Sequence, residues 1–468
     1  MLHSYWFASP AMIWAEDAAI LAHGVGGPSD LPVPMSLVLI GATSALTFTF
    51  VILAFGWRKP RFDPAKSGRA LPAWVTHTVD SQAIRWIAAI GALLFTAWVA
   101  VATVVGPQDA LNPLRGVFYV LLWVGLVAVS LAIGPVWRVV SPTGTVYRLI
   151  DSCQRKFGNG SARKLHYPTK WGYWPAALGL FAFVWLELAS PNYGTLTAIK
   201  IWLVVYVAVM MGGALLYGQR WFARADPFEV YSVVVSRLSP LRRNTGTRLI
   251  AVGNPLDHLP SMPVRPGLLA VLAVLLGSTA FDSFSAMPPV ENFVYDHEAS
   301  FPLVSAVVGG TLLRTAGLLS FIVSVAVTFW VAARAAGGID RQQRRQLPGQ
   351  MAHTLIPIVV GYVFAHYLSY LIERGQETVL LLADPLDNGW QLFGLDAWDA
   401  NYWLSLHPAA LSTIKVFCVV AGHIAGVVAA HDKALQVLPA GHQLTGQLML
   451  LLTMVGYSFL GLYLLFGA

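Results

Sequence analysis

The sequence predicts an all-α integral membrane protein with about ten transmembrane helices. Hydrophobic residues make up 56% of the 468 residues, charged residues make up only 11%, and the mean hydropathy is +0.62. A soluble protein carries roughly 25% charged residues. Many nearly uncharged stretches reach about 20 residues, which is enough to cross a bilayer as a helix. Helices are expected because lipid offers no hydrogen-bond partner to an open backbone.

Hydropathy places ten spans in one membrane domain, residues 36–468, with no separate soluble domain. The expected spans, with approximate ends, are residues 36–56, 84–105, 116–137, 174–190, 197–218, 266–283, 304–333, 350–371, 409–430 and 446–467. An outer N-terminal segment, residues 1–35, precedes them. Its apolar run lacks a basic start and contains Glu16 and Asp17, so it predicts an interfacial helix or an atypical signal peptide.

The basic residues predict the orientation. Of the 30 Lys and Arg residues, 24 lie in five alternate loops, at about residues 57–83, 138–173, 219–265, 334–349 and 431–445. Basic loops favour the cytoplasmic side, so both termini are expected outside. Basic loops that face anionic lipid account for the excess positive charge, and no nucleic-acid partner is expected. Cys153 and Cys418 fall in a cytoplasmic loop and a span, so no disulfide is expected.

Two cytoplasmic segments predict short amphipathic helices on the inner surface. "SPTGTVYRLIDS" would begin with Ser141 as N-cap, and "ADPFEVYSVVVSRLSP" with Asp226 as N-cap, each followed by proline. Gly422 and Gly426 form a GxxxG step, which is typical of close helix packing. The outer loop at about residues 372–408 is acidic and rich in aromatic residues.

Three stretches carry a resemblance to a known family. "AHGVGGPSDLPVP" (22–34), "ADPFEVYSVVVSRLSP" (225–240) and "GHIAGVVAAHDKAL" (422–435) resemble polytopic membrane proteins of bacteria, mainly actinobacteria. Some members of this family are labelled fenitrothion hydrolase. The likeness runs from about residue 22 to the end of the chain. It implies a hydrolase of phosphotriester-like substrates in the bacterial plasma membrane, and it supplies no catalytic residues. HExxH, GxSxG, Walker and GxGxxG motifs are lacking.

An inner layer of histidines is the first candidate site. His353 starts the eighth span, His423 lies in the inner half of the ninth, His431 lies at the inner end of the ninth, and His442 precedes the tenth. Imidazoles at similar depth would hold zinc, copper or iron. Pro357 leaves the carbonyl of His353 without its helical partner. The alternative is that each histidine caps a helix end or bonds a backbone carbonyl.

An outer layer of charged residues is the second candidate site. It contains Glu187, Lys200, Asp282, Arg314, His366, Glu373 and Lys415. The three carboxylates and the histidine are the candidate catalytic residues, as general bases or metal ligands. The three cations would bind a substrate anion or a phosphoryl oxygen. The alternative is structural ion pairs and outward-snorkelling Lys and Arg side chains.

Three functions follow from these layers. The resemblance favours a hydrolase in which a bound metal activates water and the outer cavity with His366 receives an apolar or anionic small molecule. A transporter or channel for a metal ion or small anion is the rival, because two polar layers at opposite depths suit a permeation path. The third is a membrane metal-binding or haem protein. In all three the lipid bilayer is a partner.

Overall fold

The computed structural model describes residues 27–66, 68–157, 164–301, 303–390, 392–395 and 398–467. Most of the expected N-terminal segment, residues 1–26, lies outside the described residues. Within them, nine helices are long and apolar enough to cross a membrane. The fourth expected span, 174–190, is the shorter apolar helix α9 (Trp174–Leu188). The all-α, multi-pass membrane fold agrees with the prediction from the sequence.

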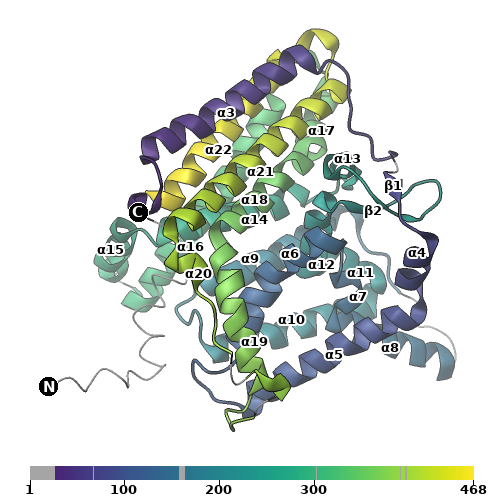
Figure 1. Ribbon diagram of the computed structural model, residues 1–468, viewed down its shortest axis with the longest axis vertical. Helices are drawn as coiled ribbons and strands as arrows, with labels where there is room; N and C mark the ends of the chain where they lie inside the picture. The colour runs from purple at the N-terminus through teal and green to yellow at the C-terminus, as the bar shows by residue number, and fades with distance from the viewer. Residues whose placement is uncertain are drawn as a thin grey trace.

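The helices form two groups (Figure 1). The first group contains α3 (Met35–Gly56), α14 (Leu268–Ser285), α16 (Ala306–Arg334), α18 (Ile356–Ser369), α21 (Pro408–Val437) and α22 (Leu448–Phe466). The second contains α5 (Gln82–Val105), α6 (Leu126–Ile133), α7 (Trp137–Val140), α8 (Pro142–Phe157), α9, α10 (Leu196–Tyr217), α11 (Gln219–Ala225) and α12 (Pro227–Val235). Packing of α14 against both α9 and α18 joins the two groups.

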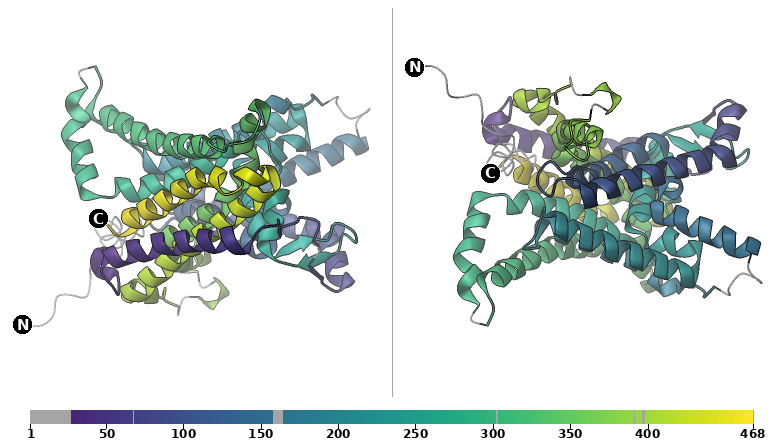
Figure 2. Two further views of the ribbon diagram at one scale, coloured as in Figure 1. Left: turned by 90° about the horizontal axis from the view of Figure 1, so that it is seen from above. Right: turned by 90° about the horizontal axis from the view of Figure 1, so that it is seen from below.

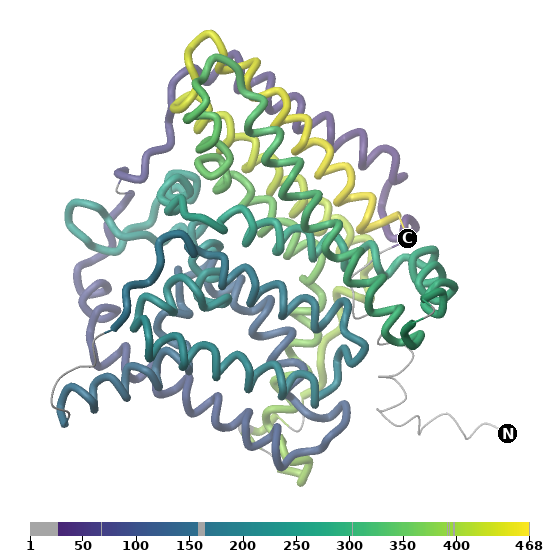
Figure 3. Tube along the Cα trace, turned by 180° about the vertical axis from the view of Figure 1, so that it is seen from behind, coloured from purple at the N-terminus to yellow at the C-terminus, as the bar shows by residue number. Residues whose placement is uncertain are grey.

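The first spanning helix packs with the last two. Figure 3 shows α3, in purple, along the yellow helices and away from the blue helices that follow it in sequence. The contacts of α3 with α21 and α22 agree with this view. The N-terminal span therefore completes the C-terminal helix group.

The loops sort to two ends of the molecule. The start of α3, α15 (Pro288–His297), α20 (Trp403–Leu406) and the end of α22 lie at one end, which we call the acidic end (Figure 2). The opposite end, the basic end, carries a small antiparallel sheet of β1 (Arg69–Ala70), β3 (Ile250–Val252) and β2 (Leu241–Arg243), in that order. It also carries α4 (Ala73–Asp80), α13 (Pro255–His258) and α17 (Arg341–Met351).

Direct contacts join the basic loops to one another. The sheet pairs the loop after α3 with the loop before α14. The guanidinium of Arg243 lies 2.7 Å from the carboxylate of Asp80, and Arg138 lies 3.2 Å from Glu229. The loops that hold most of the basic residues therefore lie on one side, as their alternation along the chain predicts.

Burial distinguishes central helices from peripheral ones. In the most apolar window of α14, 72% of the residues are buried inside the protein, against 17% for α5 and for α10. The apolar faces that α5 and α10 expose are typical of helices that face lipid. The polar residues near the end of α14 are therefore enclosed by protein.

The two expected cytoplasmic helices form, but one of them is not on the surface. Ser141 accepts a hydrogen bond from the Gly144 amide at the start of α8, and Asp226 accepts from the Phe228 and Glu229 amides at the start of α12. Every residue of α12 is buried. The prediction of an amphipathic surface helix was therefore wrong for α12, which packs against α9 and α6.

The eighth span is longer and less regular than expected. It belongs to a continuous helical segment, Arg341–Ala383. The 3₁₀ turn η7 (Ala352–Leu355) precedes α18, Pro357 lies in the first turn of α18, and the π-helix η8 (Tyr370–Arg374) leads into α19 (Gly375–Ala383). A second π-helix, η2 (Gly116–Gly125), packs against η8. π-Helical turns occur frequently at functional sites.

Candidate functional site

A buried histidine joins α14 and α18. His366 Nε2 lies 2.9 Å from Asp282 Oδ2, and His366 Nδ1 lies 3.2 Å from Ser283 Oγ. The exposed fractions are 0% for His366, 1% for Asp282 and 0% for Ser283. We call these three residues, with Tyr367, the His366 cluster.

A tyrosine hydroxyl adds a second donor to the carboxylate. Tyr367 donates to Asp282 Oδ2 at 2.7 Å, the same oxygen that faces His366. Two lone pairs on this oxygen can accept from the Tyr367 hydroxyl and, in the tautomer protonated at Nε2, from the His366 ring. Hydrogen bonds between buried polar groups offset part of the cost of burying them.

Helix geometry brings these groups to one depth. Asp282 and Ser283 lie in the last turn of α14, and His366 and Tyr367 lie in the last turn of α18. Tyr362 lies four residues before His366 and therefore on the same face of α18. Its hydroxyl is 3.4 Å from Ser283 Oγ and donates to the Gly461 carbonyl at 3.5 Å, which connects the cluster to α22.

A second carboxylate lies beside the cluster. Glu187, near the end of α9, is close enough to Asp282 for the two charges to interact. Tyr119 on η2 and Tyr370 on η8 are in turn close enough to interact with Glu187. Both π-helices thus contribute a tyrosine to the surroundings of the same pair of carboxylates.

Glu373, the fourth candidate catalytic residue, anchors an outer loop. Its two carboxylate oxygens accept from the Ser405 amide at 2.8 Å and from the Ser405 hydroxyl at 2.5 Å. One turn further on, Glu377 pairs with Arg374 at 2.9 Å and accepts from the Tyr402 hydroxyl. These contacts hold the acidic loop over the end of the helices.

The three candidate substrate-binding cations have different neighbours. Arg314 on α16 lies 6.0 Å from the ring of Tyr193, and partly buried Lys200 on α10 donates to Gln108 at 2.5 Å. Lys415 on α21 is buried, with Asp30 near enough to interact with its charge. These three contacts have no partner in common.

The four inner histidines do not gather in one metal site. In the described part of the chain, no group of three or more His, Cys, Asp and Glu residues is placed to hold a metal ion. His423 Nδ1 bonds the Val419 carbonyl one turn back, at 2.8 Å. His442 packs on Gly337 and Gly338. His353 is buried in the 3₁₀ turn before α18.

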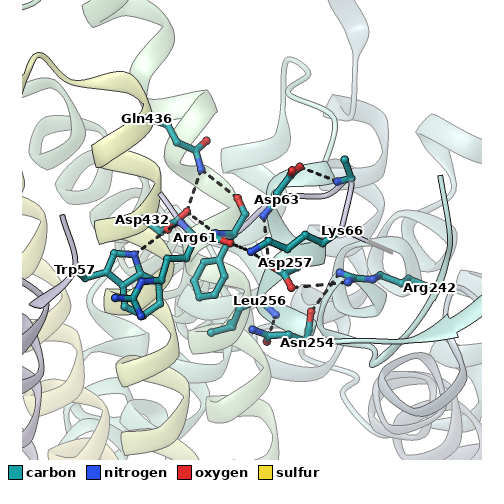
Figure 4. A network of polar contacts seen from close by, with 12 residues as sticks. Trp57, Arg61, Asp63, Lys66, Arg242, Asn254, Leu256, Asp257, Asp432 and Gln436 are labelled. Carbon is teal, nitrogen blue, oxygen red and sulfur yellow. Dashed lines mark hydrogen bonds and ion pairs between the residues drawn. The ribbon is translucent and has the colours of Figure 1, made fainter. Parts of the chain in front are cut away.

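His431 and Asp432 instead hold a loop of the basic end. The ring nitrogens of His431 lie 2.9 Å from the Trp57 carbonyl and 3.0 Å from Gln447 Oε1. Asp432 accepts from the Trp57 indole and from the amides of Arg61 and Phe62, as Figure 4 shows in part.

The same loop is fixed at its other side by Asp257. Asp257 accepts from the Asp63 amide at 3.3 Å and pairs with Lys66 and Arg242 at 3.7 and 3.8 Å (Figure 4). The polar end of "GHIAGVVAAHDKA" therefore has a structural role: it fastens the loop after α3 to α21.

The hydroxyl groups in the cluster, and that of Tyr362 beside it, had no signal of their own in the sequence. Ser283, Tyr362 and Tyr367 are common residue types in apolar helices. Two clues were present: Ser283 adjoins Asp282, and Tyr362 precedes His366 by one helical turn.

The fold and the cluster together define a class, a multi-pass helical membrane protein with an acid–histidine centre enclosed between its helices. Comparison of the chain with protein-family models, with curated proteins and with solved structures found no match.

Proposed function

We propose that this protein is a proton-coupled membrane transporter for a small solute, such as a metal ion or small anion, and that the His366 cluster takes up and releases the proton. The observation that carries the proposal is His366, fully buried and hydrogen-bonded through one ring nitrogen to Asp282 and through the other to Ser283. Ionisable groups inside a membrane protein commonly form proton relays.

The cluster has two hydrogen-bond arrangements that differ by one proton. With His366 neutral, Nε2–H donates to Asp282 and Nδ1 accepts from the Ser283 hydroxyl. A proton that arrives at Nδ1 requires this hydroxyl to turn and donate to the Thr279 carbonyl, 3.4 Å away. The proton on Nε2 can then pass to Asp282, which leaves His366 neutral and Asp282 protonated.

Burial favours a proton over a larger reactant at this position. Asp282, Ser283 and His366 have almost no contact with solvent, so a molecule the size of a phosphotriester has no surface of theirs to touch in this conformation. A proton needs only hydrogen-bonded neighbours. Protonation of Asp282 would also remove its repulsion of Glu187, and the adjoining π-helices η2 and η8 are suited to a local rearrangement.

The proposal includes an orientation, with the basic end in the cytoplasm of a bacterial cell and the plasma membrane as the location. It is supported by the 24 basic residues in the alternate loops and by the contacts that gather these loops at one end. The bacterial setting comes from the family resemblance.

The test is the charge movement that follows a pH jump on proteoliposomes adsorbed to a solid-supported electrode. We expect a transient current from the wild type. The current from Asp282→Asn and from His366→Gln should be smaller by about tenfold or more. The matched control is His297→Gln, which changes an exposed histidine at the acidic end. Currents that persist in both cluster variants, with all proteins folded, would refute the proton role.

A hydrolase is the second candidate, and one observation favours it beyond the family resemblance. Ser283, His366 and Asp282 stand in the order nucleophile, base and orienting acid, with links of 3.2 and 2.9 Å. Activation of Ser283 needs no metal ion. The helices would have to open to admit substrate, because Ser283 is fully buried.

A fluorophosphonate probe tests this candidate. Reaction would form a bond from Ser283 Oγ to phosphorus, break the P–F bond and transfer the hydroxyl proton to His366. Labelling lost in Ser283→Ala and kept in Ser300→Ala, an exposed serine, would support a hydrolase. Absence of labelling together with absence of turnover of a chromogenic phosphotriester would eliminate it.

A further inference from the structure

A second polar site lies far along the chain from the His366 cluster, at the basic end. A cavity of about 760 Å³ opens between α8, residues 164–166 and the junction of α10 with α11. This volume is within the range of small-molecule sites, about 300–1,000 Å³. Neither the inner histidines nor the outer charged residues line this cavity.

The cavity is strongly basic. Four cationic side chains line it, against one carboxylate: Arg148, Arg155, Lys164 and Arg220, with Asp151. Asp151 is already shared, since Arg155 lies 2.7 Å and Lys164 3.8 Å from its oxygens. Positive charge therefore remains in excess.

Two of the arginines have no carboxylate within salt-bridge distance in the part of the chain that the structure describes. Arg148 donates to the carbonyls of Arg138 and Val139 and to the Thr145 hydroxyl, which fixes its side chain. Arg220 lies 3.5 Å from His166 Nδ1. An arginine that is not paired with a carboxylate keeps its charge available for an anion, and the guanidinium geometry suits phosphate oxygens.

An apolar margin adjoins the basic cavity. Val146 and Leu149 on α8, Leu165, and Leu215 and Leu216 on α10 expose between 38% and 57% of their surface. They continue into the exposed apolar face of α10, which includes Ile201, Val204 and Val205. A soluble phosphate compound gains nothing from such a margin, whereas acyl chains do.

We infer that this cavity binds a phosphate group, and that its source is the headgroup of an anionic phospholipid whose acyl chains lie along α10. The phosphate accepts hydrogen bonds from Arg148 and Arg220, Lys164 supplies further charge, and the glycerol faces the apolar margin. Basic pockets at the cytoplasmic ends of membrane helices are suited to such headgroups. The site would link α8 to α10 through the lipid.

Native mass spectrometry of the full-length protein in detergent, titrated with phosphatidylglycerol, measures this binding. The test variant is Lys164→Gln/Arg220→Gln. The control is Arg341→Gln/Arg345→Gln on α17, which removes the same charge from exposed residues elsewhere on the basic end. We expect the affinity of the test variant to fall at least about tenfold and that of the control to change little.

Each remaining outcome is decisive. Equal affinities in the test variant and the wild type, or equal losses in both variants, would overturn the specific site. Titration with inorganic phosphate and with glycerol 1-phosphate separates the two sources. If either competes with the lipid at comparable concentration, the ligand is a soluble phosphate and the lipid part of the inference is wrong. Melting curves of both variants establish that they are folded.

Discussion

A change at Tyr367 tests how strongly the His366 cluster is held together, because Tyr367 follows His366 in the chain and its hydroxyl donates to Asp282. Tyr367→Phe removes this donor without changing the ring. We expect the free energy of unfolding to fall by about 1–3 kcal/mol, since a buried acceptor loses a partner at 2.7 Å. Thermal unfolding in detergent, followed by circular dichroism, measures the change. Tyr463→Phe, at an exposed tyrosine of α22, is the matched control, and equal melting temperatures for the two variants would contradict the assignment.

The raised pKa of Glu229 predicts that the stability of the basic end depends on pH. Burial raises the pKa of Glu229 from its ordinary 4.5 to about 7, against the opposing effect of half-exposed Arg138 at 3.2 Å. The folded state therefore binds the proton more tightly than the unfolded state. The contribution of Glu229 to the free energy of unfolding, roughly 3 kcal/mol, is complete below pH 4.5 and is lost as the pH rises through about 7.

The measurement is the melting temperature of the wild type and of Glu229→Gln as a function of pH. Asp226 has the same sign of effect but its pKa is raised only to about 6, again by burial. Glu229→Gln should therefore flatten the curve above pH 6 and leave a slope below it. An unchanged slope in the Gln variant would show that Glu229 is ionised throughout.

At the scale of elements, the packing of α18 on α21 depends on glycines. A Cβ at Gly422 would lie 2.6 Å from the Pro357 carbonyl oxygen, and one at Gly361 would lie 2.5 Å from the Cys418 carbonyl oxygen. Gly422→Ala should therefore force the helices apart and destabilise the protein by about 1–3 kcal/mol. The same thermal unfolding assay measures this loss.

Gly456 provides the control on α22. Nothing lies within 4 Å of a Cβ built there, so Gly456→Ala should stabilise the helix by about 0.5–1 kcal/mol. The two Gly-to-Ala changes thus have opposite expected signs. A stabilising Gly422→Ala would mean that α18 and α21 are less closely packed than the structure has them.

The GxxxG step of α21 was a sound basis for predicting close packing, whereas the polarity of α12 was misleading. The sequence of α12 with its N-cap resembles that of a surface helix because it includes the polar residues Asp226, Glu229 and Ser232. In the fold, Asp226 accepts from the Trp137 indole at 2.9 Å and Glu229 accepts from Arg138. The Ser232 hydroxyl lies 2.7 Å from the Ser130 hydroxyl. A polar residue can be buried when it is hydrogen-bonded, and a single sequence does not reveal partners that lie 89 to 102 residues away.

At the scale of the whole molecule, composition was sufficient to predict the all-α membrane class. The alternation of charge along the chain was sufficient to predict that the basic loops lie on a common side. Depth along the spans also placed His366, Asp282 and Glu187 at one level. It did not distinguish them from Glu373, which lies at a similar depth but bonds Ser405 in the loop above. Which side chains meet depends on helix rotation and on the packing of α9, α14 and α18, and neither is encoded in a hydropathy pattern.

The orientation of the whole molecule predicts which face each thiol reaches. Cys153 is exposed on α8 at the basic end, whereas Cys418 lies within α21 and both are free. In right-side-out membrane vesicles a membrane-impermeant maleimide should leave Cys153 unlabelled until the vesicles are opened, because the proposed cytoplasmic face is enclosed. In a Cys153→Ser background, Asn388→Cys in the acidic loop after α19 should label in intact vesicles. The reverse pattern would invert the orientation, and with it the direction in which the His366 cluster moves its proton, while the contacts inside the cluster would stand.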